Sequence, residues 1–139
     1  MVLGGHGDTM VPMTRFTCIN GIPIEHFLTK EQIRKIVERT RGGGAEILSL
    51  RKTASAYDAP AAAIAAMVDS ISHNRRHILP GVAVLQGEYG LHDIGMGVPV
   101  VFGENGVEQV IELPLTPEES AAFMHSAAMV RAELDHLKK

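Results

Sequence analysis

A histidine enclosed by glycines lies near the amino terminus, in the run Gly4-Gly5-His6-Gly7-Asp8. Glycine has no Cβ atom, so a substrate or another backbone segment can approach such a histidine closely. Histidine changes charge near neutral pH and can transfer a proton when a partner orients its ring. The apolar residues 1–3 before it indicate the end of a buried strand, a common position for catalytic groups. We interpret His6 as a candidate proton-transfer residue; a purely structural glycine turn is the alternative.

Asp8 allows two further interpretations of this stretch. Its carboxylate could act in catalysis, or it could accept hydrogen bonds from backbone amides of the turn, which is the commoner role. His6 and Asp8 also form an H-x-D pair, but zinc sites use three or four protein ligands. No cluster of other potential ligands completes such a set, so we predict no metal and keep a metal-dependent hydrolase as a secondary hypothesis.

Composition restricts the class of protein. The 139 residues fit a single domain, 1–139, and 45% hydrophobic content is ordinary for a soluble fold. A net charge of -3 gives no basic surface for nucleic acid or an anionic membrane, and no apolar run approaches the length of a membrane helix. The one cysteine, Cys18, excludes an internal disulfide and is predicted to be buried in a strand. We expect a cytoplasmic protein.

The other six histidines are less suggestive than His6. Each stands alone in a predicted loop or on an exposed helix face, where a solvent-facing or locally hydrogen-bonded role is expected: His26, His73, His77, His92, His125 and His136.

Turn and capping signals organise the first part of the chain. Residues 14–19 alternate as a strand does, and Asn20-Gly21 is typical of a two-residue hairpin turn leading into residues 22–24. Thr29 and Gln32 have the spacing of a capping box and predict the start of a helix.

A triple glycine and a proline punctuate the next segment. Gly42-Gly43-Gly44 is predicted to end the first helix, and its spacing matches no phosphate-binding loop. Pro60 is expected in the first turn of a second helix. The small residues of segment 61–72 predict close packing, so we expect this helix to be central and buried.

The remaining chain changes to strands. Residues 82–85, 98–102 and 107–113 are predicted strands, and Asn105-Gly106 supplies a hairpin turn between the last two. Residues 87–97 are expected to form a loop or a bulged strand.

A final helix follows, opened by Thr116-Pro117-Glu118-Glu119. The order of strands, helices, strands and helix predicts an α+β fold, with an antiparallel sheet packed against long helices and no Rossmann domain in this chain.

Several motifs, in order along essentially the whole chain, resemble the lactate and malate dehydrogenase family. They are Gly4-Gly5-His6-Gly7-Asp8-Thr9-Met10-Val11-Pro12, Asn20-Gly21-Ile22-Pro23, Gly42-Gly43-Gly44-Ala45-Glu46-Ile47, Ser55-Ala56-Tyr57-Asp58-Ala59-Pro60-Ala61, Gly87-Glu88-Tyr89-Gly90, Gly97-Val98-Pro99-Val100, Gly103-Glu104-Asn105-Gly106-Val107 and Leu113-Pro114-Leu115. The first is similar to the catalytic-histidine signature of that family.

The resemblance implies roles for five positions. His6 becomes the proton acceptor and donor of a hydride-transfer reaction, Gly5, Ser55 and Ala56 border the substrate, and Pro60 lies against the nicotinamide ring of NAD. Lactate-specific members usually carry an acidic residue in place of Gly5 and a threonine in place of Ala56. The resemblance therefore favours the malate-specific, prokaryotic branch, with a 2-hydroxy or 2-oxo dicarboxylic acid as substrate.

The resemblance also identifies this chain as a carboxyl-terminal half. The NAD-binding half, the carboxylate that orients the histidine and the arginines that bind the substrate are expected in a preceding segment. The isolated chain is then predicted to be inactive, because hydride transfer needs the cofactor positioned by the other half. Assembly into a homo-dimer or tetramer is expected. The alternatives are an L-lactate dehydrogenase domain and a non-catalytic oligomerisation module.

Overall fold

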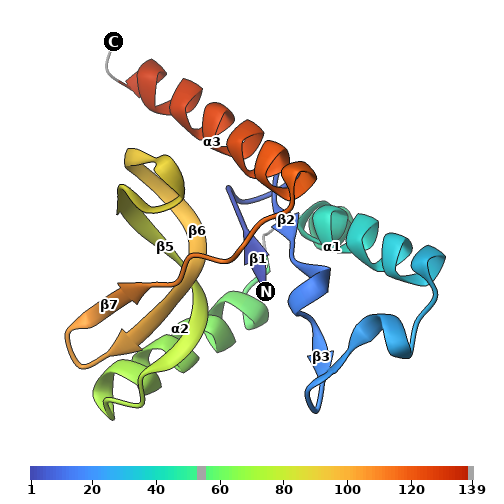
Figure 1. Cartoon of the computed structure of the whole chain (residues 1–139), viewed down its shortest axis with the longest axis horizontal. Helices are drawn as coiled ribbons and strands as arrows, with labels where there is room; N and C mark the ends of the chain where they lie inside the picture. The colour runs from blue at the N-terminus through green and yellow to red at the C-terminus, as the bar shows by residue number, and fades with distance from the viewer. Residues whose placement is uncertain (53–55, 138–139) are drawn as a thin grey trace.

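The computed structural model describes residues 1–52 and 56–137, and within these ranges the chain forms three long helices and three antiparallel sheets (Figure 1). The helices are α1 (Lys30–Arg51), α2 (Asp58–Ser72) and α3 (Pro117–Leu137), and the short 3-10 helices are η1 (Thr14–Phe16), η2 (Ile24–His26) and η3 (Glu88–Gly90). The strands are β1 (Val2–Leu3), β2 (Val11–Pro12), β3 (Cys18–Ile19), β4 (Ile22–Pro23), β5 (His77–Gln86), β6 (His92–Gly103) and β7 (Gly106–Val110). Within the described ranges no helix is both long and apolar enough to cross a membrane.

The main sheet has the order β5-β6-β7, and β6 is its most buried strand. Met96, Val98 and Val100 of β6 are fully buried, together with Leu3 of β1 and Phe123 of α3. All the strand pairs formed by the described residues are antiparallel. The predicted α+β fold with an antiparallel sheet and long helices is therefore confirmed.

The predicted hairpin at Asn20-Gly21 is confirmed, since β3 and β4 pair on either side of it. Both turn residues have positive φ, 49° and 81°. The strand before the turn is shorter than predicted, because residues 14–16 form the 3-10 helix η1. Cys18 is exposed, so its predicted burial is wrong. A strand pair of two residues on each side is too short to be covered by another layer.

The helix start at Thr29 is confirmed as a capping box. The Gln32 N–H donates to Thr29 Oγ1 at 3.3 Å, and the Thr29 N–H donates to Gln32 Oε1 at 2.8 Å. The predicted end at residues 42–44 is wrong, since α1 continues to Arg51 and ends where Lys52 adopts a φ of 61°. Glycine lowers the stability of a helix but does not prevent its formation. Residues of high helix propensity on both sides of the glycines offset this cost.

Replacing Gly43 with alanine is expected to stabilise the fold by about 0.5–1 kcal/mol. An added Cβ would meet no atom within 4 Å, so alanine causes no clash in the folded state. The stabilisation comes from the lower conformational entropy of the unfolded chain. Urea unfolding measures the change. Gly106→Ala is the control: its Cβ also points into open space, but the φ of +87° disfavours alanine and should reverse the sign. Equal stabilisation by both changes would contradict this explanation.

Helix α2 begins at Asp58 and contains Pro60 in its first turn, as predicted. Its predicted central, buried position is wrong: only Ser70 of this helix is fully buried, and Ile64 and Val68 are 60% and 55% exposed. Small residues permit close packing but supply little apolar area to drive it. The helix therefore contacts the core through its carboxyl-terminal half, where Met67 and Ile71 are partly buried.

The strands of the second half are confirmed with different bounds: β5 and β6 are longer than predicted, whereas β7 ends at Val110, before the predicted end at residue 113. β6 begins at His92, so most of segment 87–97 is strand, preceded by η3 and an irregularity in the pairing between Leu85 and Gln86. The antiparallel hairpin between β6 and β7 is confirmed, but Gly103 pairs with Gly106, so the turn lies at residues 104–105, one position before the predicted pair 105–106.

The start of α3 combines a cap with an ion pair. Thr116 and Glu119 exchange backbone-to-side-chain hydrogen bonds of 2.9 and 3.2 Å, which confirms the predicted capping box. Arg15 Nε and Nη2 also donate to the Glu119 carboxylate at 2.9 and 2.7 Å. The hydrogen bond from Arg15 lowers the pKa of Glu119 below its usual value.

This lowered pKa predicts a pH-dependent loss of stability in Glu119→Gln. A carboxyl whose pKa is lower in the folded state stabilises the fold fully above its unfolded pKa of about 4.3, and the stabilisation disappears as pH falls through the folded-state pKa. The difference in unfolding free energy between wild type and Glu119→Gln should thus be full at pH 7 and vanish in acid. Urea unfolding across pH 2–7 measures it, with Glu133→Gln, exposed on the same helix, as the control. A difference that does not change with pH would contradict the assignment.

Candidate functional site

Residues 4–10, here called the His6 loop, connect β1 to β2. The loop is anchored to the main sheet because Gly4 and Gly97 exchange two backbone hydrogen bonds of 2.9 Å. Within the loop, the Met10 N–H donates to the Gly7 carbonyl at 3.1 Å. Gly4 and Gly7 have φ values of +93° and +103°, a conformation that side chains other than glycine rarely adopt. The backbone of the loop therefore favours glycine at positions 4 and 7.

Two helices hold the same loop from other directions. The Gly5 N–H donates to Ser126 Oγ of α3 at 2.7 Å, and Ser126 Oγ donates to Thr9 Oγ1 at 3.1 Å. Arg41 Nε of α1 donates to the Met10 carbonyl at 3.1 Å. The backbone on both sides of His6 is thus fixed by β6, α1 and α3.

His6 itself is exposed and borders two adjoining hollows. The first, of about 440 Å³, lies between the His6 loop, α1, α2 and the main sheet, and is lined by Val2, Leu3, Gly4, Gly5, His6, Met10, Thr40, Met67, Pro80, Gly81, Val82 and Gly97. The second, of about 510 Å³, lies between α1 and the start of α2, and is lined by His6, Gly44, Ile47, Leu48, Ala56, Ala59, Pro60 and Ala63. A side chain shared by two hollows can contact two bound groups at once.

The structure brings together four of the five predicted site residues. Gly5 lines the first hollow, Ala56 and Pro60 line the second, and His6 lines both. Ser55 lies outside the described residues. His6 and Ala56, fifty positions apart in the sequence, thus border the same hollow.

The alternatives for Asp8 find no support in the contacts. In the ranges 1–52 and 56–137, neither the His6 ring nor the Asp8 carboxylate makes a hydrogen bond or an ion pair, so Asp8 neither orients the ring nor caps the turn. The same ranges contain no group of three or more His, Cys, Asp or Glu side chains that could hold a metal ion. The described part of the chain therefore offers no set of metal ligands for the secondary hypothesis of a metal-dependent hydrolase.

The exposure predicted for the other six histidines is confirmed. Two of them, His77 and His92, begin strands of the main sheet and do not lie in loops. Only His6 borders either of the two adjoining hollows.

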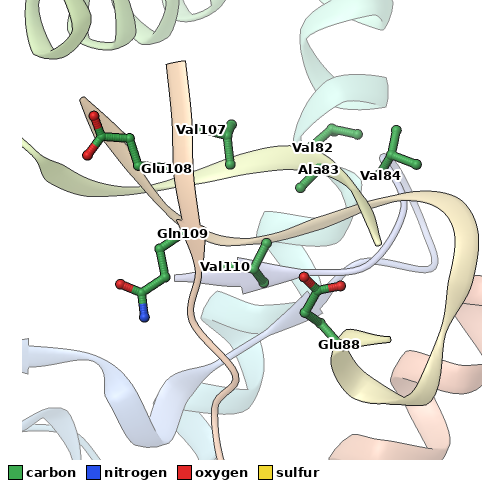
Figure 2. A pocket seen from close by; sticks show the side chains of 8 residues that line it. All are labelled: Val82, Ala83, Val84, Glu88, Val107, Glu108, Gln109 and Val110. Carbon is green, nitrogen blue, oxygen red and sulfur yellow. The ribbon is translucent and has the colours of Figure 1, made fainter. Parts of the chain in front are cut away.

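A further hollow, of about 590 Å³, lies over the main sheet (Figure 2). His6 is not among its lining residues. Valines of β5 and β7 line it, with Glu88 and Glu108 as its acidic groups. Both carboxylates are already engaged: Glu88 accepts the Gln86 N–H at 2.7 Å, which lowers its pKa, and Glu108 pairs with Arg76 at 3.2 Å. The lowered pKa makes Glu88 a poor proton donor, and the Glu108 carboxylate is occupied by its ion pair, so we place the candidate site at His6.

Sequence reasoning missed the residues that support the His6 loop. Ser126 is 121 positions from Gly5, and Arg41 and Gly97 are also remote from the loop. One signal was present: Ser126 interrupts the apolar stripe formed by Phe123, Ala127 and Val130 on α3. A hydroxyl in a buried stripe needs a hydrogen-bond partner, which marks it for a structural or functional contact.

Comparisons with known proteins agree with this architecture. The family model of the lactate/malate dehydrogenase α/β C-terminal domain matches residues 1–139. A malate dehydrogenase from Nitrosococcus oceani is 62% identical over 139 residues, which are all of this chain and 45% of that protein.

Two solved structures are similar over nearly the whole chain. Malate dehydrogenase from Salinibacter ruber is 47% identical with a TM-score of 0.95, and the match covers 99% of this chain and 45% of that one. Lactate dehydrogenase from Eimeria maxima, solved with NADH and oxamate, is 34% identical with a TM-score of 0.95, covering 99% and 44%. The chain thus spans less than half the length of these relatives. It belongs to the lactate/malate dehydrogenase family, and it forms the α/β C-terminal domain of that family.

Proposed function

We propose that this chain is the substrate domain of an NAD-dependent malate dehydrogenase, which oxidises (S)-malate to oxaloacetate reversibly with His6 as the proton acceptor and donor. The observation that carries the proposal is the position of His6 at the junction of two hollows, one bordered by Gly5 and the other by Ala56 and Pro60. The names of the 62% and 47% identical relatives support malate as the substrate.

The proposed role of His6 is a proton transfer at one ring nitrogen. In the oxidation, neutral His6 accepts the hydroxyl proton of malate as hydride leaves the same carbon. In the reduction, protonated His6 donates a hydrogen bond to the ketone of oxaloacetate and then gives up its proton. A histidine suits both directions because both of its charge states are accessible near neutral pH. The glycine-rich loop leaves its exposed ring open to a substrate.

The second hollow fits one face of a nicotinamide ring. Ile47, Leu48, Pro60 and Ala63 give it an apolar lining next to His6, and such a lining excludes water from the position where hydride moves. NAD supplies the hydride acceptor when it is bound. No lysine or arginine is among the described lining residues, which supports the expectation that the phosphates of NAD are held mainly by a separate NAD-binding half.

Gly5 supports a dicarboxylic substrate through the family resemblance, because lactate-specific members usually carry an acidic residue at this position. In this domain a Cβ added to Gly5 would lie 3.3 Å from Val130 Cγ2 and 3.4 Å from Ser126 Oγ, so a larger residue would crowd α3. L-lactate dehydrogenase is the alternative. The lactate dehydrogenase from Eimeria maxima matches this chain with a TM-score of 0.95, equal to that of the malate dehydrogenase from Salinibacter ruber.

A fusion protein tests the proposal. The half of the Nitrosococcus oceani malate dehydrogenase that this chain does not match is joined in front of Met1, and NADH formation is measured with malate and with lactate. We expect turnover with malate, much less with lactate, and negligible turnover by the 139-residue chain alone. Preference for lactate would establish the alternative, and full activity of the isolated chain would overturn the domain assignment.

Apolar side chains on the two outer helices support the prediction of self-association. Leu50 of α1 is 75% exposed, and Ile64 and Val68 of α2 are 60% and 55% exposed. Exposed apolar patches of this kind mark interaction surfaces. We propose that the enzyme is a homo-dimer or tetramer, and sedimentation of the fusion protein as a monomer at micromolar concentration would contradict this.

A further inference from the structure

Ser126 is a fully buried polar residue on an otherwise apolar helix face. Its exposed fraction is 0%, and its neighbours along the buried stripe of α3 are Phe123 and Ala127. An apolar residue would pack as well at such a position, and a hydroxyl there is costly unless its hydrogen bonds are made. The contacts that this hydroxyl makes therefore indicate what the residue does.

Both partners of the Ser126 hydroxyl belong to the His6 loop, one on each side of His6. The oxygen accepts the Gly5 N–H at 2.7 Å, and the hydroxyl donates to Thr9 Oγ1 at 3.1 Å. The helix also approaches the loop closely, because a Cβ added to Gly4 would lie only 2.7 Å from Ser126 Oγ. This one side chain thus ties the residue preceding His6 to the returning segment of the loop.

The His6 ring has no hydrogen-bond partner of its own among residues 1–52 and 56–137. Its position within this domain therefore follows from the backbone that carries it. The backbone pairing of Gly4 with Gly97 fixes the start of the loop, and Arg41 fixes its end at Met10. Between these anchors, the hydrogen bond from Gly5 to Ser126 is the tertiary contact next to His6.

We propose that Ser126 is a positioning residue, which holds the backbone at Gly5 and Thr9 so that His6 faces both hollows. The expected effect of Ser126 on catalysis rests on the proposed function. Its contact with the His6 loop can be measured without enzyme turnover. Displacement of a catalytic group by about 1 Å can reduce a rate by about 10²-fold, so the lost hydrogen bonds should act on kcat.

Ser70 provides a matched control within the same chain. It is also 0% exposed, and its hydroxyl also joins a helix to the sheet, donating to the Phe102 carbonyl at 2.7 Å and accepting the His77 N–H at 3.2 Å. Ser70 lines neither of the two hollows, and both partners of its hydroxyl lie outside the His6 loop. Ser70→Ala therefore reproduces the loss of a buried hydroxyl without touching the site.

The first measurement is amide hydrogen exchange by NMR in the 139-residue chain. Ser126→Ala should raise the exchange rate of the Gly5 amide about tenfold, the effect of losing one hydrogen bond of about 1.4 kcal/mol. Ser70→Ala should leave Gly5 unchanged and instead raise exchange at His77. Equal Gly5 exchange in the two variants would overturn the proposal.

The second measurement is malate oxidation by the fusion protein. Ser126→Ala should lower kcat by about 10–100-fold with KM changed less than threefold, whereas Ser70→Ala should retain the wild-type kcat at a temperature where both variants are folded. Equal kcat values for the two variants would overturn the catalytic part of the proposal. If the unmutated fusion protein shows no malate-dependent turnover, the proposed function fails, while faster exchange at Gly5 would still support the role of Ser126 in holding the loop.

Discussion

Replacing His6 with alanine in the fusion protein is expected to lower kcat for malate by about 10²–10⁴-fold, the usual contribution of a positioned acid–base group. The change removes the only histidine that borders the two hollows, and with it the proposed proton acceptor. KM should change little, since the ring is proposed to act mainly in the transition state. Steady-state NADH formation measures both constants.

His125→Ala is the control for His6→Ala. His125 is exposed on α3 and lines neither hollow, so its loss should leave kcat unchanged. Stability should also be unchanged in both variants, because both rings are exposed. A His6→Ala protein that retains more than one tenth of the wild-type kcat would remove His6 from the proposed mechanism.

Replacing Gly97 with alanine is expected to destabilise the fold by about 2–3 kcal/mol, near the upper end of the usual cost of overpacking. A Cβ at this position would lie 2.5 Å from the Gly4 carbonyl oxygen, and a backbone atom cannot rotate away as a side chain can. The two hydrogen bonds between Gly4 and Gly97 must then lengthen or break. Urea unfolding of the 139-residue chain measures the loss.

Gly95→Ala isolates this clash. Gly95 lies two residues earlier on the same strand, and its added Cβ would meet only Val82 Cγ1 at 3.4 Å, an ordinary contact. We expect a stability change of less than about 1 kcal/mol there. Because Gly97 anchors the His6 loop, Gly97→Ala should also reduce kcat in the fusion protein, whereas Gly95→Ala should not. Similar destabilisation by both changes would show that the contact with Gly4 is not responsible.

The sequence alone determined the features that depend on nearby residues. The capping boxes at Thr29 and Thr116 and the hairpin turn at residues 20–21 appear in the structure as predicted, and the second hairpin turn forms one position earlier than predicted, at residues 104–105. Each involves groups within three or four positions of one another, so residue type and spacing are sufficient to specify it. The glycine-flanked histidine is a local feature of the same kind.

Other expectations failed because the deciding interactions are not local. The triple glycine does not end α1, since helix formers on both sides outweigh its cost. Helix α2 is exposed over most of its length, and Cys18 is exposed as well. Burial depends on which elements cover a surface, and small or apolar residues in a segment do not reveal that.

The surroundings of His6 were decided only by the tertiary structure. An isolated antiparallel bridge places Gly97 of β6 against Gly4, and packing of α3 brings Ser126 to Gly5 across 121 positions of sequence. Residues of α1 and of the first turns of α2 line one hollow together with His6. The sequence thus singled out His6 as the candidate for proton transfer, and long-range packing determined the two hollows it borders and the contacts that hold its loop, because sequence spacing does not specify contacts between distant segments.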